Sequence, residues 1–332
     1  MNYGIAFAFM ALLCFIVDWL ASYGKVRTKW QSFITNFFLA LPAFFATPNT
    51  EHYFDITRFS LLMEDIRSIN NLSGKFGGLE WSLHSSEYSQ EPFVAIYVWI
   101  FSLFKNNGFL FFVSTFIFLM ALAWFISQAG RFYHISVFHQ ILVKYTILGL
   151  FNIVYEVAGV RNFLAFMVFC AAFFYDISHK SFNGKWLCWV LYFFCMMLHP
   201  ATIMLVLLRI LAGLSDQLKY STIFDIFIIL ILLFYSKLIS LTLQILSLLS
   251  SVPFVNFLLL KGQYYLYGQS NYQSFAGTRE IIGISLILLD QVVEFIFFLH
   301  LSRCNLVKGY SVFYVFVMTL VLGSILNTQI YT

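Results

Sequence analysis

The sequence predicts an all-α, polytopic integral membrane protein that crosses a lipid bilayer about ten times, and three observations support this fold class. Of its 332 residues, 61% are hydrophobic and only 10% are charged, whereas soluble domains contain roughly a quarter of charged residues. Apolar stretches of about 20 residues, the length of helix that crosses the hydrocarbon core, recur along the whole chain. These stretches lack the alternating pattern of a membrane β-barrel, so helices are the expected way to satisfy the backbone in lipid.

The first two predicted spans are residues 3–24 and 30–47, and the loop between them contains three basic residues. Cytoplasmic loops of membrane proteins are enriched in Lys and Arg, so this loop is predicted to be cytoplasmic. The polar segment 48–91 then forms a large outer loop. Asp18, near the end of the first span, is interpreted as an interfacial residue.

Residues 92–104 are apolar but short, so they are predicted to form a re-entrant or interfacial helix that returns to the outer face. Turns marked by Gly, Asn, Pro or charge separate the remaining spans, which are predicted at 109–128, 136–153, 160–177, 186–199, 201–214, 222–238, 280–301 and 309–330. The chain is therefore interpreted as a single transmembrane domain, residues 1–332, in which the outer segments 48–91 and 241–279 cover an outward-facing cavity.

Charge and cysteine content exclude several other classes of protein. The net charge of +4 is too small to indicate nucleic-acid binding. The five cysteines show no Cys-x-x-Cys spacing and lie in or beside apolar stretches, so neither disulfides nor a thiolate metal site is expected. No spacing of His, Asp and Glu is typical of a metal site, and no cofactor is expected.

Ionisable residues near the predicted outer face form the candidate site, because charges at membrane depth need a partner, water or a function. Glu156 and Arg161 bracket a turn, and His199 ends the span opposite, so these side chains can share one cavity. Asp55 and Glu91 lie where the large outer loop meets the membrane.

Three further arginines, Arg58, Arg67 and Arg279, bring positive charge to the same face. Guanidinium groups bind phosphate through paired hydrogen bonds and keep their charge, so this face suits an anion such as a lipid-linked pyrophosphate. Tyr264 and Tyr265, in the second outer segment, are candidates for stacking on sugar rings.

A carboxylate or imidazole beside such an anion can accept the proton of an attacking hydroxyl, which is the general-base part of sugar transfer. Asp55, Glu91 and His199 are the catalytic candidates on this reasoning. The alternative is structural: Glu156 and Arg161 form an ion pair, and His199 is a hydrogen-bonded residue at a helix end.

Four short motifs resemble those of EpsG-like, Wzy-type polysaccharide polymerases in order and spacing. They are His52-Tyr53-Phe54-Asp55, Glu91-Pro92-Phe93, Gly159-Val160-Arg161-Asn162-Phe163-Leu164-Ala165 and Leu198-His199-Pro200-Ala201. The resemblance covers roughly residues 42–214. The chain departs from the family pattern at Asn162, where Gln is usual, and at the Pro-Ala pair that follows the histidine.

The resemblance implies a membrane glycosyltransferase of the GT-C-like kind in the bacterial cytoplasmic (inner) membrane. Its substrates would be undecaprenyl-pyrophosphate-linked oligosaccharides, joined by inverting transfer at the outer face to lengthen O-antigen, capsule or exopolysaccharide. Arg161 and Arg279, with Arg58 and Glu156, would bind the donor. Membrane lipids, a chain-length regulator and a flippase are the expected partners.

Two alternatives use other residues or another acceptor. A proton-coupled transporter or a flippase for lipid-linked glycans would use the predicted membrane carboxylates Asp225, Asp290 and Glu294. An O-antigen ligase or a membrane acyltransferase would act on the same class of glycan but would not build a polymer.

Overall fold

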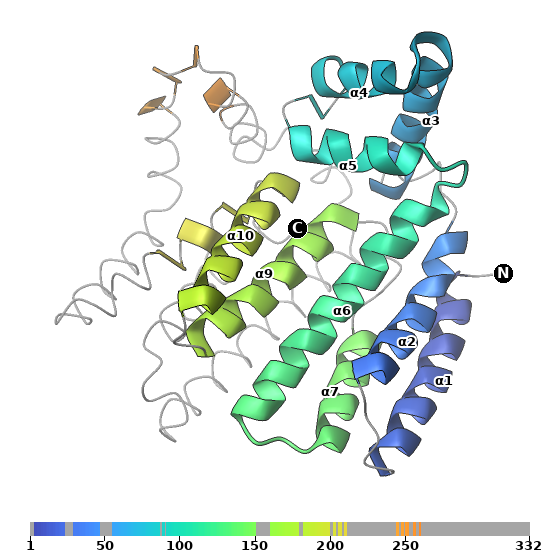
Figure 1. Cartoon of the computed structure of the whole chain (residues 1–332), viewed down its shortest axis with the longest axis vertical. Helices are drawn as coiled ribbons and strands as arrows, with labels where there is room; N and C mark the ends of the chain where they lie inside the picture. Colours follow the sequence, from blue (N-terminus) through green and yellow to red (C-terminus); the bar gives the residue numbers. More distant parts are fainter. Residues whose placement is uncertain are drawn as a thin grey trace, which may run out of the picture. The chain divides into compact units, whose positions relative to one another are not determined.

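The structure is a computed structural model that describes residues 3–23, 29–46, 55–86, 88–89, 91–150, 160–178 and 182–199, together with isolated positions between 202 and 259 (Figure 1). The chain divides into two compact units, Met1–Ile203 and Met204–Thr332. The helices of the described part belong to the first unit: α1 (Tyr3–Tyr23), α2 (Lys29–Ala40), η1 (Leu41–Phe45), α3 (Asp55–Ser73), α4 (Lys75–His84), α5 (Pro92–Ser102), α6 (Gly108–Phe132), α7 (Val137–Leu150), α9 (Val160–Ser178) and α10 (Phe182–Leu198).

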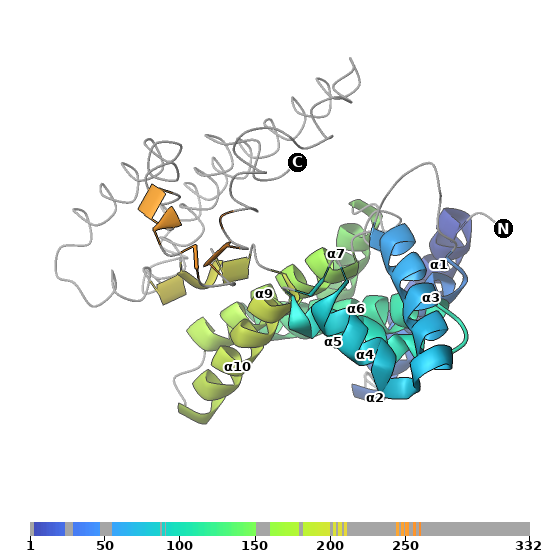
Figure 2. The ribbon, with the colours of Figure 1, turned by 90° about the horizontal axis from the view of Figure 1, so that it is seen from above.

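Five of these helices lie side by side in the order α1, α2, α6, α9 and α10, and α7 packs against α1 and α6 (Figure 1). Helices α3, α4 and α5 pack on one another and form a cap over one end of the long helices, at the top of Figure 1 and seen from above in Figure 2. The all-α class is therefore confirmed for the described part of the chain, where every regular element is a helix.

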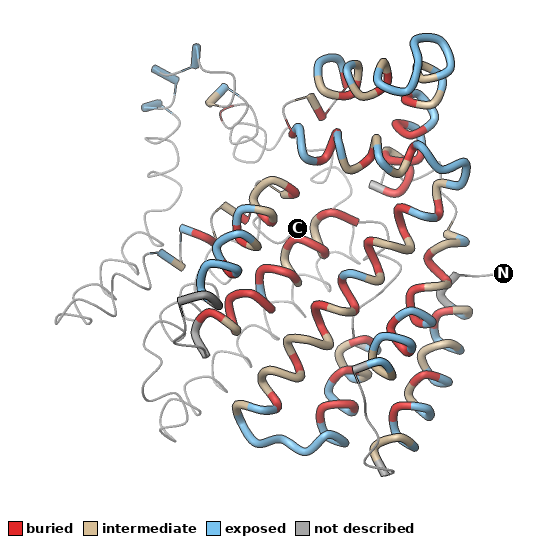
Figure 3. The backbone as a smooth tube through the Cα atoms, viewed as in Figure 1, coloured by how far each residue is buried: buried red, intermediate tan, exposed pale blue. Residues whose placement is uncertain are grey.

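Within the described residues, two helices are long and apolar enough to cross a membrane: Ile5–Ser22, in α1, and Gly108–Phe132, which is α6. Their surroundings differ. Only 17% of the α1 window is buried, and side chains such as Phe9 and Leu20 are exposed, whereas half of the α6 window is buried (Figure 3). Helix α6 is thus the centre of the row, and α1 presents an apolar outer surface.

The cap replaces the large outer loop expected from the sequence, because the described part of segment 48–91 forms α3 and α4 rather than irregular structure. Helix α3 buries Phe59, Met63 and Ile66, whose spacing places them on one face. They join a core that includes Val98 of α5 and Tyr88. The apolar face of α3 is difficult to recognise in the sequence, because many charged residues lie between its buried positions.

A close backbone contact sets the start of α6. The Asn106 side chain accepts a hydrogen bond from the Gly108 amide at 2.8 Å. A Cβ atom on Gly108 would lie 1.9 Å from the Phe44 carbonyl oxygen, so glycine allows η1 to pack directly on α6.

Most predicted spans up to residue 199 correspond to helices whose ends differ from the prediction by a few residues. The predicted span 30–47 is divided, because α2 ends at Ala40 and Pro42 begins the 3-10 helix η1. The predicted spans from residue 211 onward, and all of the outer segment 241–279 except isolated positions, lie outside the described residues.

Candidate functional site

A buried tyrosine brings two arginines together at the junction of the cap and α9. Tyr88 is 1% exposed and lies between α4 and α5. The guanidinium carbon of Arg58, from α3, lies 5.4 Å from the centre of its ring, and that of Arg161, from α9, lies 5.0 Å from it. Both distances fit a cation–π contact, so the ring supports two positive charges from distant parts of the sequence.

Glu91 forms an ion pair with one of these arginines, in which Arg161 Nη1 donates to Glu91 Oε2. Both residues are buried, with exposed fractions of 6% and 8%. Glu91 immediately precedes α5, and Arg161 is the second residue of α9. We call Arg58, Tyr88, Glu91 and Arg161 the arginine–tyrosine cluster.

The arginine–tyrosine cluster contains two guanidinium groups and the carboxylate of Glu91. Guanidinium groups bind phosphate and other anions through paired hydrogen bonds, so the cluster is a candidate anion site. Arg58 is only half-buried, which leaves one side of the cluster closer to solvent than Glu91 and Arg161 are.

The turn that contains Tyr88 and Glu91 holds both residues in a defined relation. The Glu91 amide donates to the Tyr88 carbonyl at 2.8 Å, and the Tyr88 amide donates to Ser86 Oγ at 3.1 Å. Ser86 Oγ donates in turn to the Ser82 carbonyl at the end of α4. These bonds fix the ring and the carboxylate on one short segment, so Arg58 and Arg161 meet a preformed surface.

Helices α9 and α10 run antiparallel, so His199, which follows the end of α10, lies at the same end of the helices as Arg161, near the start of α9 (Figure 1). Its half-buried ring packs against Phe166 of α9, with ring centres 5.5 Å apart. Phe166 follows Arg161 by five residues, about 7.5 Å along the helix. A contact between Phe93 and Phe194 at 5.8 Å connects α5 to α10 near this point.

The structure thus brings together three of the residues named from the sequence, Arg58, Glu91 and Arg161, and places His199 nearby. Asp55 begins α3, one helical turn before Arg58, and its side chain lies outside the described set. The remaining candidates also lie outside the described residues: Glu156, Tyr264, Tyr265 and Arg279.

Arg67, predicted to lie on the same face as the other arginines, is on α3 as Arg58 is, and it forms hydrogen bonds with the end of α5 and the residue before α6. Its Nε donates to the Ser102 carbonyl at 3.1 Å, and its Nη2 donates to Asn107 Oδ1. Burial lowers the pKa of this guanidinium below its ordinary value, and the charge of Glu64 opposes the shift. Arg67 therefore connects α3 to the end of α5, which is a structural role.

A second buried charge pair was missed in the sequence. Asp18 is fully buried, not interfacial as expected, and its Oδ2 lies 3.4 Å from Lys144 Nζ. Tyr145 donates to the same oxygen at 3.0 Å, and Gln31 donates to Oδ1 at 3.4 Å. The signal was present, because a lysine in the middle of a predicted apolar span needs a counter-charge on a neighbouring helix.

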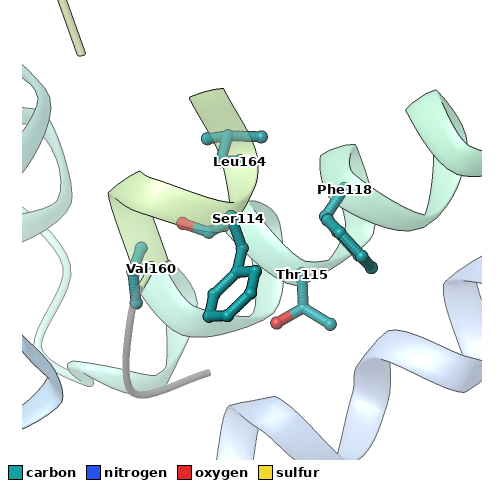
Figure 4. A pocket seen from close by; sticks show the side chains of 6 residues that line it. Ser114, Thr115, Phe118, Val160 and Leu164 are labelled. Atoms are coloured by element: carbon teal, nitrogen blue, oxygen red, sulfur yellow. The ribbon is translucent and has the colours of Figure 1, made fainter. Parts of the chain in front are cut away.

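A small cavity lies between α6 and α9, beside the start of α9 (Figure 4). Its volume is about 10 Å³, room for roughly one water molecule. The lining side chains are Ser114, Thr115, Phe118, Val160, Phe163 and Leu164. A space of this size is too small for a sugar, so this cavity is not the candidate substrate site.

Within the described ranges, no three His, Cys, Asp or Glu side chains are grouped to hold a metal ion.

Comparison with known proteins found no protein-family model, no curated protein and no solved structure that matches this chain.

Proposed function

We propose that this protein is a polytopic glycosyltransferase of the bacterial cytoplasmic membrane that polymerises lipid-linked oligosaccharides at the outer face. The observation that carries the proposal is the convergence of Arg58 and Arg161 on one buried tyrosine, with Glu91 beside them. Glu91 and Arg161 belong to the motifs on which the resemblance depends, and Arg58 follows the motif residue Asp55 by three positions.

The two arginines of the cluster support a diphosphate ligand. Each guanidinium group can bind a phosphate through two parallel hydrogen bonds, and a diphosphate offers two phosphates to two arginines. Arginine also neutralises the charge that develops on a departing diphosphate, so a metal ion is not required for this step.

A membrane setting is supported by the surface of the helix row. Helix α1 exposes large apolar side chains along most of its length, including Ile5, Phe9, Leu12 and Leu20. An exposed apolar surface of this extent is unusual on a soluble protein and suits contact with lipid chains. The cap formed by α3, α4 and α5 would then lie at the outer face, beside the head group of a lipid-linked substrate.

The reaction is an inverting displacement at the anomeric carbon of the donor glycan. The acceptor hydroxyl oxygen forms the new glycosidic bond, the bond from that carbon to the diphosphate breaks, and its electron pair leaves with the lipid diphosphate. A nearby carboxylate or imidazole takes the hydroxyl proton. Glu91 and His199 are the described candidates for this role, and Asp55 is the third residue proposed.

The test is a polymerisation assay with purified protein in nanodiscs and undecaprenyl-pyrophosphate-linked repeat units. We expect the wild-type protein to produce a ladder of glycans, and Arg161→Ala to lower ladder formation by at least 100-fold, since an electrostatic stabiliser of the transition state is typically worth about 10²–10³ in rate. Arg131→Ala is the matched control, because Arg131 is an exposed arginine at the far end of α6 and should leave the ladder intact.

Three outcomes would contradict the proposal. A full ladder from Arg161→Ala would remove the arginine–tyrosine cluster from the mechanism. A single addition by the wild-type protein would identify a ligase, and translocation of the intact lipid-linked unit without a new glycosidic bond would identify a flippase.

A further inference from the structure

We infer that Glu91 is a ligand-controlled base: in the unliganded protein its carboxylate occupies the place of a phosphate on Arg161, and the diphosphate of the substrate displaces it. The displaced carboxylate then accepts the proton of the attacking hydroxyl. This inference deepens the proposed function and rests on it.

The ion pair itself is the first argument. A carboxylate and a phosphate bind a guanidinium group in the same way, through oxygens that accept from adjacent N–H groups. Glu91 therefore mimics one phosphate of the ligand on Arg161. A diphosphate has more negative charge and more acceptor oxygens than a carboxylate, and Arg58 adds a second guanidinium group against the same tyrosine ring. A diphosphate therefore competes effectively with Glu91 for Arg161.

The exchange requires side-chain motion only. Glu91 and Tyr88 belong to the same hydrogen-bonded turn, and the Glu91 carbonyl also accepts from the Ala95 amide at 3.1 Å. The backbone at Glu91 is thereby fixed, while the stacking of Arg161 on Tyr88 holds its guanidinium in place. Because Arg161 stays on the ring and the backbone of Glu91 is fixed, the displaced carboxylate stays within the site. Its side chain can then turn to the face of the anomeric carbon opposite the diphosphate, where an inverting displacement places the attacking hydroxyl.

The paired and displaced states differ in chemistry. In the paired state the carboxylate oxygen of Glu91 is occupied by Arg161. Once the diphosphate binds Arg161, that oxygen is released and can accept the proton of the attacking hydroxyl. The base is then available only when the donor is bound.

The experiment measures binding of farnesyl pyrophosphate, a lipid diphosphate without sugar, to protein in nanodiscs. We expect Glu91→Gln to bind the probe about tenfold more tightly than the wild-type protein, because the competing carboxylate is gone, and to lose ladder formation. Glu64→Gln is the matched control, since Glu64 is exposed on α3 and should change neither quantity.

A second measurement uses the wild-type protein alone, so that it does not depend on the folding of a variant. A lipid-soluble carbodiimide modifies carboxyl groups that take up a proton, and mass spectrometry locates the modified residue. We expect farnesyl pyrophosphate to increase modification of Glu91 several-fold and to leave Glu64 unchanged.

The results separate this inference from the proposed function. If the wild-type protein produces a ladder, but Glu91→Gln binds the probe no more tightly and Glu91 modification does not increase, the inference is wrong and the polymerase assignment stands. If the wild-type protein neither binds the probe nor forms a ladder, the proposed function itself fails.

Discussion

The ring of Tyr88 is the residue on which the candidate site depends, since Arg58 and Arg161 both stack on it and Phe59 supports it at a centre-to-centre distance of 5.4 Å. We expect Tyr88→Leu to lower the rate of polymerisation about tenfold or more, because each cation–π contact at a buried site contributes on the order of 1–2 kcal/mol. Tyr88→Phe retains the ring and should keep most of the activity. Equal loss in both variants, measured as initial ladder formation, would show that the ring does not support the arginines.

The sequence was sufficient to predict the candidate residues but not how they pair. Arg58, Glu91 and Arg161 stand out because charges are rare in this chain. Tyr88 does not, since 20% of the chain is aromatic and one tyrosine carries no signal of its own. The structure pairs Arg161 with Glu91, 70 positions away, a contact that the sequence did not predict. Glu156, the partner considered from the sequence, lies outside the described residues. Separation along the chain gives no information on such a contact.

Among the helices, the packing of η1 on α6 predicts a sharp difference between two glycines. A methyl group at Gly108 would collide with the Phe44 carbonyl, whereas a methyl group at Gly149 of α7 meets no atom within 4 Å. We expect Gly108→Ala to lower stability by about 1–3 kcal/mol, the usual cost of overpacking. Gly149→Ala should be neutral or slightly stabilising. The measurement is the melting temperature of each purified variant in detergent, and equal values would contradict the close contact.

The pair of Asp18 and Lys144 connects α1 to α7 and can be tested by removing the charges one at a time. We expect Asp18→Asn or Lys144→Met alone to destabilise the protein by about 3–5 kcal/mol, because each leaves a buried charge without its partner. The double variant should recover most of that loss. Fluorescence-detected size-exclusion chromatography after heating measures this effect, and additive losses in the double variant would show that the two residues do not interact.

Long apolar helices were predictable from hydropathy, because one physical requirement, burial of about 20 apolar residues, determines them. Helix α1 matches its predicted span within a residue at its C-terminal end. Helix α3 was not predicted, because its charges conceal the buried positions Phe59, Met63 and Ile66. Their spacing of three and four residues was the available signal. The position where α2 gives way to η1 was also readable, from Pro42.

At the scale of the whole molecule, we predict that the cap and the loop between α6 and α7 lie on opposite sides of the membrane. Helix α6 connects them and is 25 residues long, enough to span the hydrocarbon core. Ser85, at the end of α4, and Ser136, before α7, are both exposed and are suitable sites for single cysteines in a background without the native ones.

A membrane-impermeant maleimide should label Ser85→Cys in intact cells and Ser136→Cys only after the membrane is permeabilised. Labelling of both positions in intact cells, or of Ser136→Cys alone, would contradict the proposed orientation. The two serines have similar exposure, so a difference in labelling reports their side of the membrane.

The most direct test of the central claim is an experimental structure of the protein in nanodiscs with an undecaprenyl-pyrophosphate-linked glycan bound. We predict that the diphosphate lies within hydrogen-bond distance of both guanidinium groups on the Tyr88 ring, and that Glu91 has left Arg161. A diphosphate bound elsewhere, with the Glu91–Arg161 pair unchanged, would contradict the assignment of this cluster as the substrate site.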